Sequence, residues 1–390
     1  MIKIALPNTA YIEGMHLTHC KPYTLKKLKF YNDLFNRLGN KKLVSLGTET
    51  FFNKYELDAS TVKLMVEPFL KPAYKKKSKK TIDIQNIKSL LTTTQDYFIY
   101  GTSNLNYFRD ILKFIEEIEN DIDDILIGKP CVLNAIKNKI IYTKSNIKRN
   151  ILEQVFRYED LSDKGFEIPV NGEKSTWGSY TLTTALGVNV CPYCNRSWIN
   201  TVGTQNNKAT NPQLDHFFSK SDFPILRLSL YNLIPSCETC NARLKGNIKF
   251  EYDENLHPYE EGYGNSAKFY SIGNDCESVL GQSNNYTIGI TYSDLITQET
   301  KDRIEKNHKL FKVDEIYKYH GDIVSEIYLK KQLYSTRYLE MLRSSIRFQK
   351  HIDVNELYRI AFSNYKDESE FNKRPFAKLT KDIAEQLKLI

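Results

Sequence analysis

Hydrophobic residues recur at helical spacing through most of the first 150 residues. The pattern predicts one helix that stops at Gly39, since glycine commonly follows a helix C-terminus. Its apolar positions are Leu28, Tyr31, Leu34, Phe35 and Leu38. A second predicted helix ends at Gly128 and Pro130. Its apolar positions are Phe108, Ile111, Leu112, Ile115, Ile118, Ile122 and Ile125.

The pattern changes in residues 171–260, where turn residues, cysteines and short apolar stretches replace the long periodicities. Helical spacing returns after about residue 300, along Ile316, His320, Ile323 and Ile327. We interpret His320 as a core histidine rather than a ligand. The expected fold is therefore α+β and mostly helical. A mainly helical region (1–170) is followed by a small metal module (171–260) and a second mainly helical region (261–390).

Composition fits a globular chain of two or three domains. The 390 residues are 41% hydrophobic and 26% charged, with a formal charge of +8. No apolar run approaches the roughly 20 residues that cross a bilayer, and the first residues lack the apolar core of a signal peptide. We therefore expect a cytoplasmic protein without a membrane partner. The charge permits a polyanionic partner without requiring one.

Two basic segments have open interpretations. Residues 71–80 are dense in lysine and are either a solvated loop or an arm that contacts phosphate. Residues 372–378 are interpreted as a solvated basic turn, with a phosphate contact as the alternative.

Four of the seven cysteines form two C-x-x-C pairs, Cys191/Cys194 and Cys237/Cys240. In a reducing compartment this spacing indicates metal rather than disulfides. Four thiolates complete a tetrahedral zinc shell with no open position, which is typical of a structural site. Iron, alone or in a cluster, could use similar thiolates. We interpret the remaining cysteines as ordinary thiols: Cys20, Cys131 and Cys276.

Between and beside these pairs run two informative segments, Gln213–Phe218 (QLDHFF) and Tyr231–Gly246 (YNLIPSCETCNARLKG). Over about 55 residues, from Cys191 to Lys245, the chain resembles the HNH endonuclease family. Tyr193 and Asn195 add to the match. The resemblance implies a ββα-metal fold with an Asp-His pair on its first strand. Within the family it looks most like the HNH subunits of bacterial anti-phage systems of the Septu and retron-linked types.

The resemblance assigns roles that elementary chemistry supports. His216 has the pKa range of a general base for water, and Asn232 would orient its segment. Asp215 and Asn241 offer oxygen ligands to one catalytic Mg²⁺ or Mn²⁺. Because neighbouring side chains on a regular strand point to opposite faces, a site shared by Asp215 and His216 predicts a bend or bulge.

Candidate nucleic-acid contacts lie close to this site. Lys245 follows Asn241 by one helical turn, and Arg243 lies between them. His257 is either a further contact at the rim or part of a structural turn.

The expected function is that of a metal-dependent endonuclease with structural zinc, working in anti-phage defence. The expected partner is a nucleic acid, with DNA ahead of RNA. The resemblance to defence HNH subunits also implies a separate ATPase as partner, and the chain itself has no Walker A pattern. The first alternative is a zinc-stabilised nucleic-acid-binding protein without activity. The second is an iron protein for electron transfer.

Overall fold

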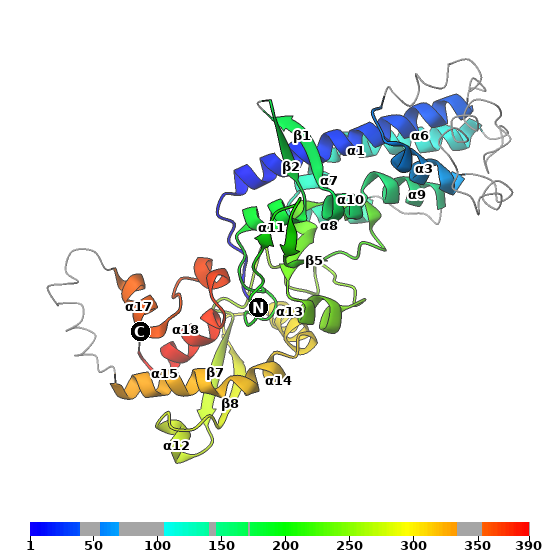
Figure 1. Ribbon diagram of the computed structural model, residues 1–390. Coiled ribbons are helices and arrows are strands. Elements are labelled where there is room, and N and C mark those ends of the chain that lie inside the picture. Colours follow the sequence, from blue (N-terminus) through cyan, green and yellow to red (C-terminus); the bar gives the residue numbers. More distant parts are fainter. Residues whose placement is uncertain (40–54, 70–104, 140–145, 171, 334–352, 390) are drawn as a thin grey trace, which may run out of the picture. The chain divides into compact units, whose positions relative to one another are not determined.

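A computed structural model describes residues 1–39, 55–69, 105–139, 146–170, 172–333 and 353–389. Helices predominate and the sheets are short and antiparallel, so the predicted α+β, mostly helical class is confirmed (Figure 1). The chain divides into two compact units. Unit 1 comprises Met1–Ile12, Ser179–Ser219 and Leu233–Ile390, and unit 2 comprises Glu13–Gly178 and Lys220–Asn232. None of the described helices is long and apolar enough to cross a bilayer.

In its described residues, unit 2 is mainly helical and has one two-stranded sheet. Its elements are α1 (Thr9–Gly39, which begins in unit 1), α3 (Ala59–Val66), η1 (Glu67–Phe69), α6 (Leu105–Asn120), α7 (Ile122–Ile127), α8 (Pro130–Lys139), α9 (Asn146–Val155), α10 (Tyr158–Asp163), β1 (Phe166–Val170), β2 (Glu173–Trp177), η3 (Pro224–Leu226) and η4 (Leu230–Asn232).

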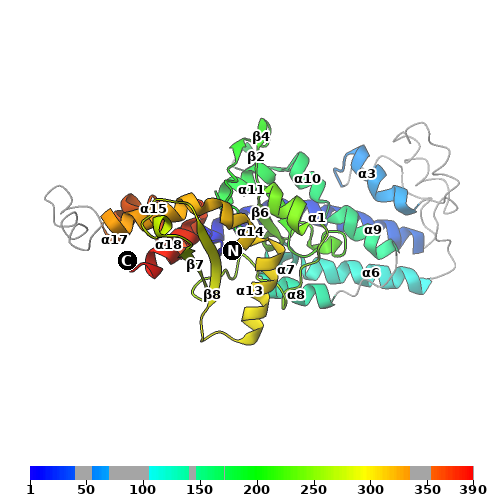
Figure 2. The same ribbon diagram turned by 90° about the horizontal axis from the view of Figure 1, so that it is seen from below.

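The first predicted helix is confirmed as the second half of α1. Leu28, Tyr31, Leu34 and Phe35 are buried, and Leu38 has its side chain outside the described part. The Phe35 ring lies 6.3 Å from Phe108 of α6, and α1 and α6 run side by side in both views (Figure 2). The basic run at residues 71–80 lies outside the described residues.

The second predicted helix is two helices. Helix α6 ends at Asn120, and α7 continues the apolar stripe to Ile127. Gly128 ends α7 as predicted, with its N–H on the Asp124 carbonyl at 2.9 Å. Pro130 was wrongly interpreted as part of a stop, because it begins α8. The first turn of a helix needs no N–H from this residue, so proline fits there.

The described part of unit 1 contains three two-stranded sheets and the remaining described helices. Its elements are α11 (Ser179–Leu186), β3 (Val202–Gly203), β4 (Lys208–Thr210), β5 (Gln213–His216), β6 (Leu233–Ser236), η5 (Thr239–Lys245), β7 (Ala267–Gly273), α12 (Cys276–Val279), β8 (Tyr286–Tyr292), α13 (Gln298–Leu310), α14 (Val313–Tyr317), η6 (Lys318–His320), α15 (Gly321–Leu333), α17 (Val354–Phe362), η7 (Glu368–Lys373) and α18 (Ala377–Gln386).

Helix α18 is buried along nearly its whole length against β7. Lys378 and Asp382 form an ion pair at 2.7 Å inside this core, and the Phe269 N–H donates to Asp382 at 2.9 Å. A buried charge is tolerated only when it is paired and hydrogen-bonded, and these contacts meet that condition. The interpretation of residues 372–378 as a solvated turn is therefore wrong for Lys378, which is 1% exposed.

The stripe predicted along residues 316–327 is helical but interrupted. Helix α14 ends at Tyr317, a 3₁₀ turn follows at Lys318–His320, and α15 starts at Gly321. The turn rotates the face that is buried, so Tyr317, Val324 and Tyr328 are buried together with Ile327. His320 is half-buried, and its ring packs 4.6 Å from that of Phe376.

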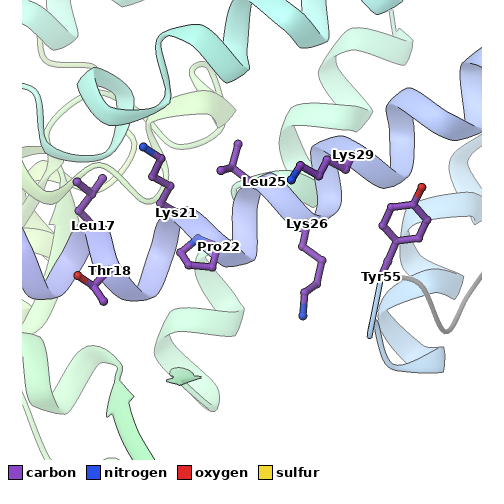
Figure 3. A pocket seen from close by; sticks show the side chains of 8 residues that line it. All are labelled: Leu17, Thr18, Lys21, Pro22, Leu25, Lys26, Lys29 and Tyr55. Carbon is purple, nitrogen blue, oxygen red and sulfur yellow. The ribbon is translucent and has the colours of Figure 1, made fainter. Parts of the chain in front are cut away.

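A surface hollow of about 830 Å³ runs along α1 in unit 2. All of its lining side chains except Tyr55 come from α1 (Figure 3). Two of its lysines are in ion pairs, Lys21 with Asp123 and Lys26 with Glu56. None of the site residues predicted from the sequence lines it.

The core of unit 2 contains a fully buried histidine, His16 on α1. Its Nδ1 accepts a hydrogen bond from the Trp177 indole at 3.0 Å, and its Nε2 contacts the Leu228 carbonyl at 2.7 Å. An acceptor at Nδ1 and a donor at Nε2 describe a neutral imidazole. Burial lowers the pKa of His16 to about 4.

This burial predicts a pH-dependent stability. A folded-state pKa of about 4, against 6.5 for the free side chain, means that the unfolded chain binds the proton more tightly. The stabilisation is complete above pH 6.5 and falls as the pH drops towards 4, by about 3 kcal/mol in total. Urea unfolding followed by fluorescence of the buried Trp177 measures the loss.

His16→Gln serves as the comparison. Its stability is lower at every pH, but it lacks the titrating group and should therefore depend less steeply on pH between 6.5 and 4. Equal slopes for the two proteins would remove His16 as the source.

Candidate functional site

Strands β5 and β6 form an antiparallel pair that carries the predicted Asp-His motif. Asp215 pairs with Ile234 and His216 with Leu233, and no bulge interrupts the register. Asp215 and His216 are 4% and 7% exposed, so both lie in the interior of unit 1. The expected bulge is absent from the paired residues. His216 is the last residue of β5, so the backbone can change direction only after it.

The four predicted cysteine ligands come together beside this hairpin. The Sγ atoms of Cys191, Cys194, Cys237 and Cys240 all lie within 4.8 Å of one another, and all four residues are buried. Tetrahedral coordination at about 2.3 Å per sulfur requires comparable separations. The cluster can therefore hold a metal ion and is compatible with a structural zinc site. The other cysteines are single, with Cys20 buried and Cys131 and Cys276 exposed.

Local backbone geometry explains why each C-x-x-C pair closes. Asn195 has a φ of 48°, in the left-handed region that asparagine tolerates, and its N–H donates to the Cys191 carbonyl at 2.8 Å. In the second pair, the Cys240 N–H donates to Cys237 Sγ at 3.4 Å. Both turns bring their two thiols to one side of the chain.

The thiols interact closely enough to change one another's acidity. Hydrogen bonds from Cys191, Cys237 and Cys240 hold the pKa of Cys194 well below its usual range. Burial raises the pKa of the Cys191 thiol. The four thiols therefore titrate as a coupled group, and negative charge that forms within the cluster favours capture of a cation.

Each oxygen of the Asp215 carboxylate accepts a hydrogen bond from a neighbouring side chain. Lys245 donates to its Oδ1 at 2.7 Å, and the Tyr193 hydroxyl donates to its Oδ2 at 2.6 Å. Lys245 also donates to the His216 carbonyl at 2.7 Å, and its ammonium lies 4.8 Å from the Phe250 ring centre. Lys245 was predicted as a phosphate contact, yet it is 4% exposed and is the counter-ion of Asp215.

Tyr193 is the site residue whose role the sequence analysis missed. It lies between the first two cysteines, so the turn that closes the metal cluster also sets its hydroxyl on Asp215. Burial raises its pKa well above the usual range, which keeps the hydroxyl a hydrogen-bond donor. The only signal in the sequence was an aromatic residue inside a C-x-x-C pair.

Asn241 directly follows Cys240, and both residues lie on η5, a short helix of π type. The Asn241 amide nitrogen donates to Gln213 Oε1 at 2.9 Å, so the amide oxygen faces away from that bond. Arg243 is exposed and pairs with Glu238 at 3.3 Å. Of the three nucleic-acid contacts predicted close to the site, Lys245 and His257 are buried and Arg243 lies at the surface.

The last two candidates are buried. Asn232, which belongs to unit 2, is 0% exposed, and its amide donates to the Leu226 carbonyl at 2.9 Å, which fixes the segment before β6. His257 is also 0% exposed, and its ring packs 4.2 Å from that of Phe217. This buried position agrees with the interpretation of His257 as part of a structural turn. A nucleic acid could reach it only if the chain around it moved.

Comparisons with family models, with curated proteins and with solved structures find no match to this chain. The chemistry of the site therefore rests on its own residues. It combines a closed four-thiol cluster that suits a metal ion, a buried Tyr193–Asp215–Lys245 network beside His216, and an accessible Asn241–Arg243 edge.

The thiol cluster predicts a metal-dependent fold. Cys237→Ser should lose the bound ion and lower the melting temperature by roughly 10 °C or more, because binding at a four-thiolate site contributes directly to folding. Elemental analysis and thermal unfolding test this. Cys276→Ser is the control, since Cys276 is exposed and outside the cluster. A folded, metal-free wild-type protein would contradict the prediction.

Proposed function

We propose that this chain is an HNH-type endonuclease that hydrolyses phosphodiester bonds. The observation that carries the proposal is the order and contact of three elements. Strands β5 and β6 pair, η5 follows directly, and Lys245 of η5 bonds to Asp215 and His216 of β5. This succession of two antiparallel strands and a helix beside four thiols agrees with the ββα-metal module that the resemblance implies.

His216 is the proposed general base, because an imidazole accepts a proton from water near neutral pH. Asp215 and the free amide oxygen of Asn241 are the proposed ligands of one Mg²⁺ or Mn²⁺. Such an ion would supply charge stabilisation at the phosphate oxygens. The exposed Arg243 is the proposed contact to the substrate backbone.

Lys245 takes a different role in this proposal from the one its position in the sequence suggested. Its ammonium neutralises Asp215 and donates to the carbonyl of His216. These two contacts fix the end of β5 against η5. A carboxylate has about four lone-pair sites, and two hydrogen bonds leave capacity for a further ligand. Lys245 is therefore proposed as a positioning residue.

We also propose that the four-thiol cluster holds zinc with a structural role, because a closed shell of four thiolates leaves no open coordination position. The biological setting proposed is bacterial anti-phage defence, with DNA ahead of RNA as substrate and a separate ATPase as partner. This part of the proposal rests on the resemblance alone.

A second candidate is a zinc-stabilised nucleic-acid-binding protein without activity. Engagement of both Asp215 oxygens by Tyr193 and Lys245 favours it, since a carboxylate used to hold the fold needs no catalytic metal. The two candidates differ in whether the protein turns over substrate.

The first test of the proposal changes the base. Because His216 is only 7% exposed, His216→Gln, which keeps much of the volume, is preferable to alanine. Cleavage of plasmid or single-stranded DNA with Mn²⁺ should fall by about 10² or more, as is typical for loss of a general base. Zinc content and melting temperature should remain close to wild type. Activity within about tenfold of wild type would exclude His216 as the base.

The second test separates the two metals. Brief EDTA treatment followed by gel filtration should give inactive protein that retains zinc, since thiolates hold zinc more firmly than two oxygen ligands hold Mg²⁺. Added Mg²⁺ or Mn²⁺ should restore cleavage. Asn241→Ala should require a higher metal concentration, and its half-exposed position makes unfolding a poor explanation for that result.

Two outcomes would contradict this division of the site. Cleavage by the treated protein without added ions would mean that zinc is catalytic or that no ion is needed. Tight binding without cleavage under any metal condition would favour the binding protein.

A further inference from the structure

Two buried nitrogen atoms near the thiol cluster have no hydrogen-bond partner among the described residues. They are Nε of Arg196 and Nε2 of His320. Each residue is half-buried, so the nitrogen is recessed while part of the side chain reaches the surface. A buried polar atom left unpaired costs about 1–3 kcal/mol, so two such atoms in one region favour the binding of a further polar group there.

Three contacts bring these two residues into one region of unit 1. The Tyr317 hydroxyl donates to the Cys194 carbonyl at 2.6 Å, and the Phe376 N–H donates to the Asn195 carbonyl at 2.7 Å. The Phe376 ring then packs 4.6 Å from the His320 ring. Arg196 directly follows Asn195, and its positive charge contributes to lowering the pKa of His320 after the larger effect of burial.

Exposed aromatic side chains flank this pair in the sequence. Trp198, two residues after Arg196, is 56% exposed, and Tyr319, directly before His320, is 77% exposed. The exposed rings of Trp198 and Tyr319 provide faces on which unpaired bases can stack. By this adjacency along the chain we group Arg196, Trp198, Tyr319 and His320 as the Arg196 cluster.

We propose that the Arg196 cluster binds a phosphate group of a single-stranded nucleic acid, with Arg196 and His320 donating to the phosphate oxygens and the aromatic rings stacking on bases. The proposal rests on the nuclease function proposed above and adds a binding site that is separate from Asp215 and His216.

The residue types match this ligand. A guanidinium presents a planar fork of donors that fits phosphate, and imidazole Nε2–H adds a further donor. Asp322, at the start of α15, is the acidic group whose charge acts on His320, and Lys318 in the preceding turn is exposed and basic. A free phosphate would use the two donors but not the aromatic faces, so stacking distinguishes a strand from a small anion.

The test is binding of a fluorescein-labelled single-stranded DNA oligonucleotide, followed by anisotropy without added divalent ions. Arg196→Gln should weaken binding about tenfold or more, as expected for loss of a charge-assisted hydrogen bond. It should also reduce the slope of log Kd against log salt by about 0.7, the value for one contact to a single strand. His320→Phe keeps a ring against Phe376 and should weaken binding about threefold or more. Trp198→Ala should weaken it about fivefold or more.

Arg359→Gln is the matched control, because it removes one positive charge from an exposed ion pair on α17. It should leave Kd within about twofold and the salt slope unchanged. Metal content and melting temperature are measured for every variant, to separate the loss of a contact from the loss of the fold. If Arg196→Gln is unstable, Arg196→Lys replaces it, because lysine keeps the charge but lacks the planar guanidinium.

Binding of Arg196→Gln equal to wild type overturns the inference. So does an affinity for adenosine monophosphate or inorganic phosphate as high as that for the oligonucleotide, which would assign the cluster to a small anion. If the wild type cleaves and the Arg196 variant binds and cleaves equally well, the inference fails while the nuclease proposal stands. If no cleavage occurs but Arg196→Gln loses binding, the nuclease proposal fails and the binding site stands.

Discussion

The four-thiol cluster is the constraint on which the site in unit 1 depends. It joins the Cys191–Cys194 turn to the Cys237–Cys240 turn, and each turn carries further contacts on its neighbouring residues. Tyr193 reaches Asp215, and Asn241 begins the exposed edge of η5. On the other side, Asn195 accepts the Lys378 N–H and donates to the Phe371 carbonyl, which fixes the start of α18. A change in the separation of the thiols would therefore move the proposed active site and the C-terminal core together.

Two buried lysine–aspartate pairs support this arrangement, one on each side of the cluster. Lys245–Asp215 joins η5 to β5, and Lys378–Asp382 lies within α18, where a β7 N–H completes the bonding of the carboxylate. Such pairs add little net stability, because desolvation offsets the attraction. Their effect is on register, since either charge without its partner would be strongly unfavourable in the interior. The Lys245–Asp215 pair thus fixes the position of β5 relative to η5.

The positions of apolar and paired cysteine residues in the interior were predictable from the sequence, because these residue types favour burial or metal binding by themselves. Apolar spacing located α1 and the α6–α7 stripe, and the cysteine spacing identified the four residues that the fold brings together. The failures concern residues whose environment is created by distant parts of the chain. Lys245 was interpreted as a phosphate contact and Lys378 as part of a solvated turn, since lysine is usually exposed, and nothing local reveals that the fold buries each of them beside a carboxylate. The 3₁₀ turn at Lys318–His320 was missed because spacing alone does not distinguish a continuous helix from two short ones.

The division of the chain into two units has a consequence for how the protein can be taken apart. Unit 1 contains the first residues and two later segments, and Lys220–Asn232, which lies between the two cysteine pairs, belongs to unit 2. The chain therefore passes from one unit to the other four times. No single cut of the polypeptide separates them, and a fragment that begins after Gly178 lacks Met1–Ile12 of its own unit while it carries a piece of the other. Truncation at one point therefore cannot yield either unit complete and free of the other.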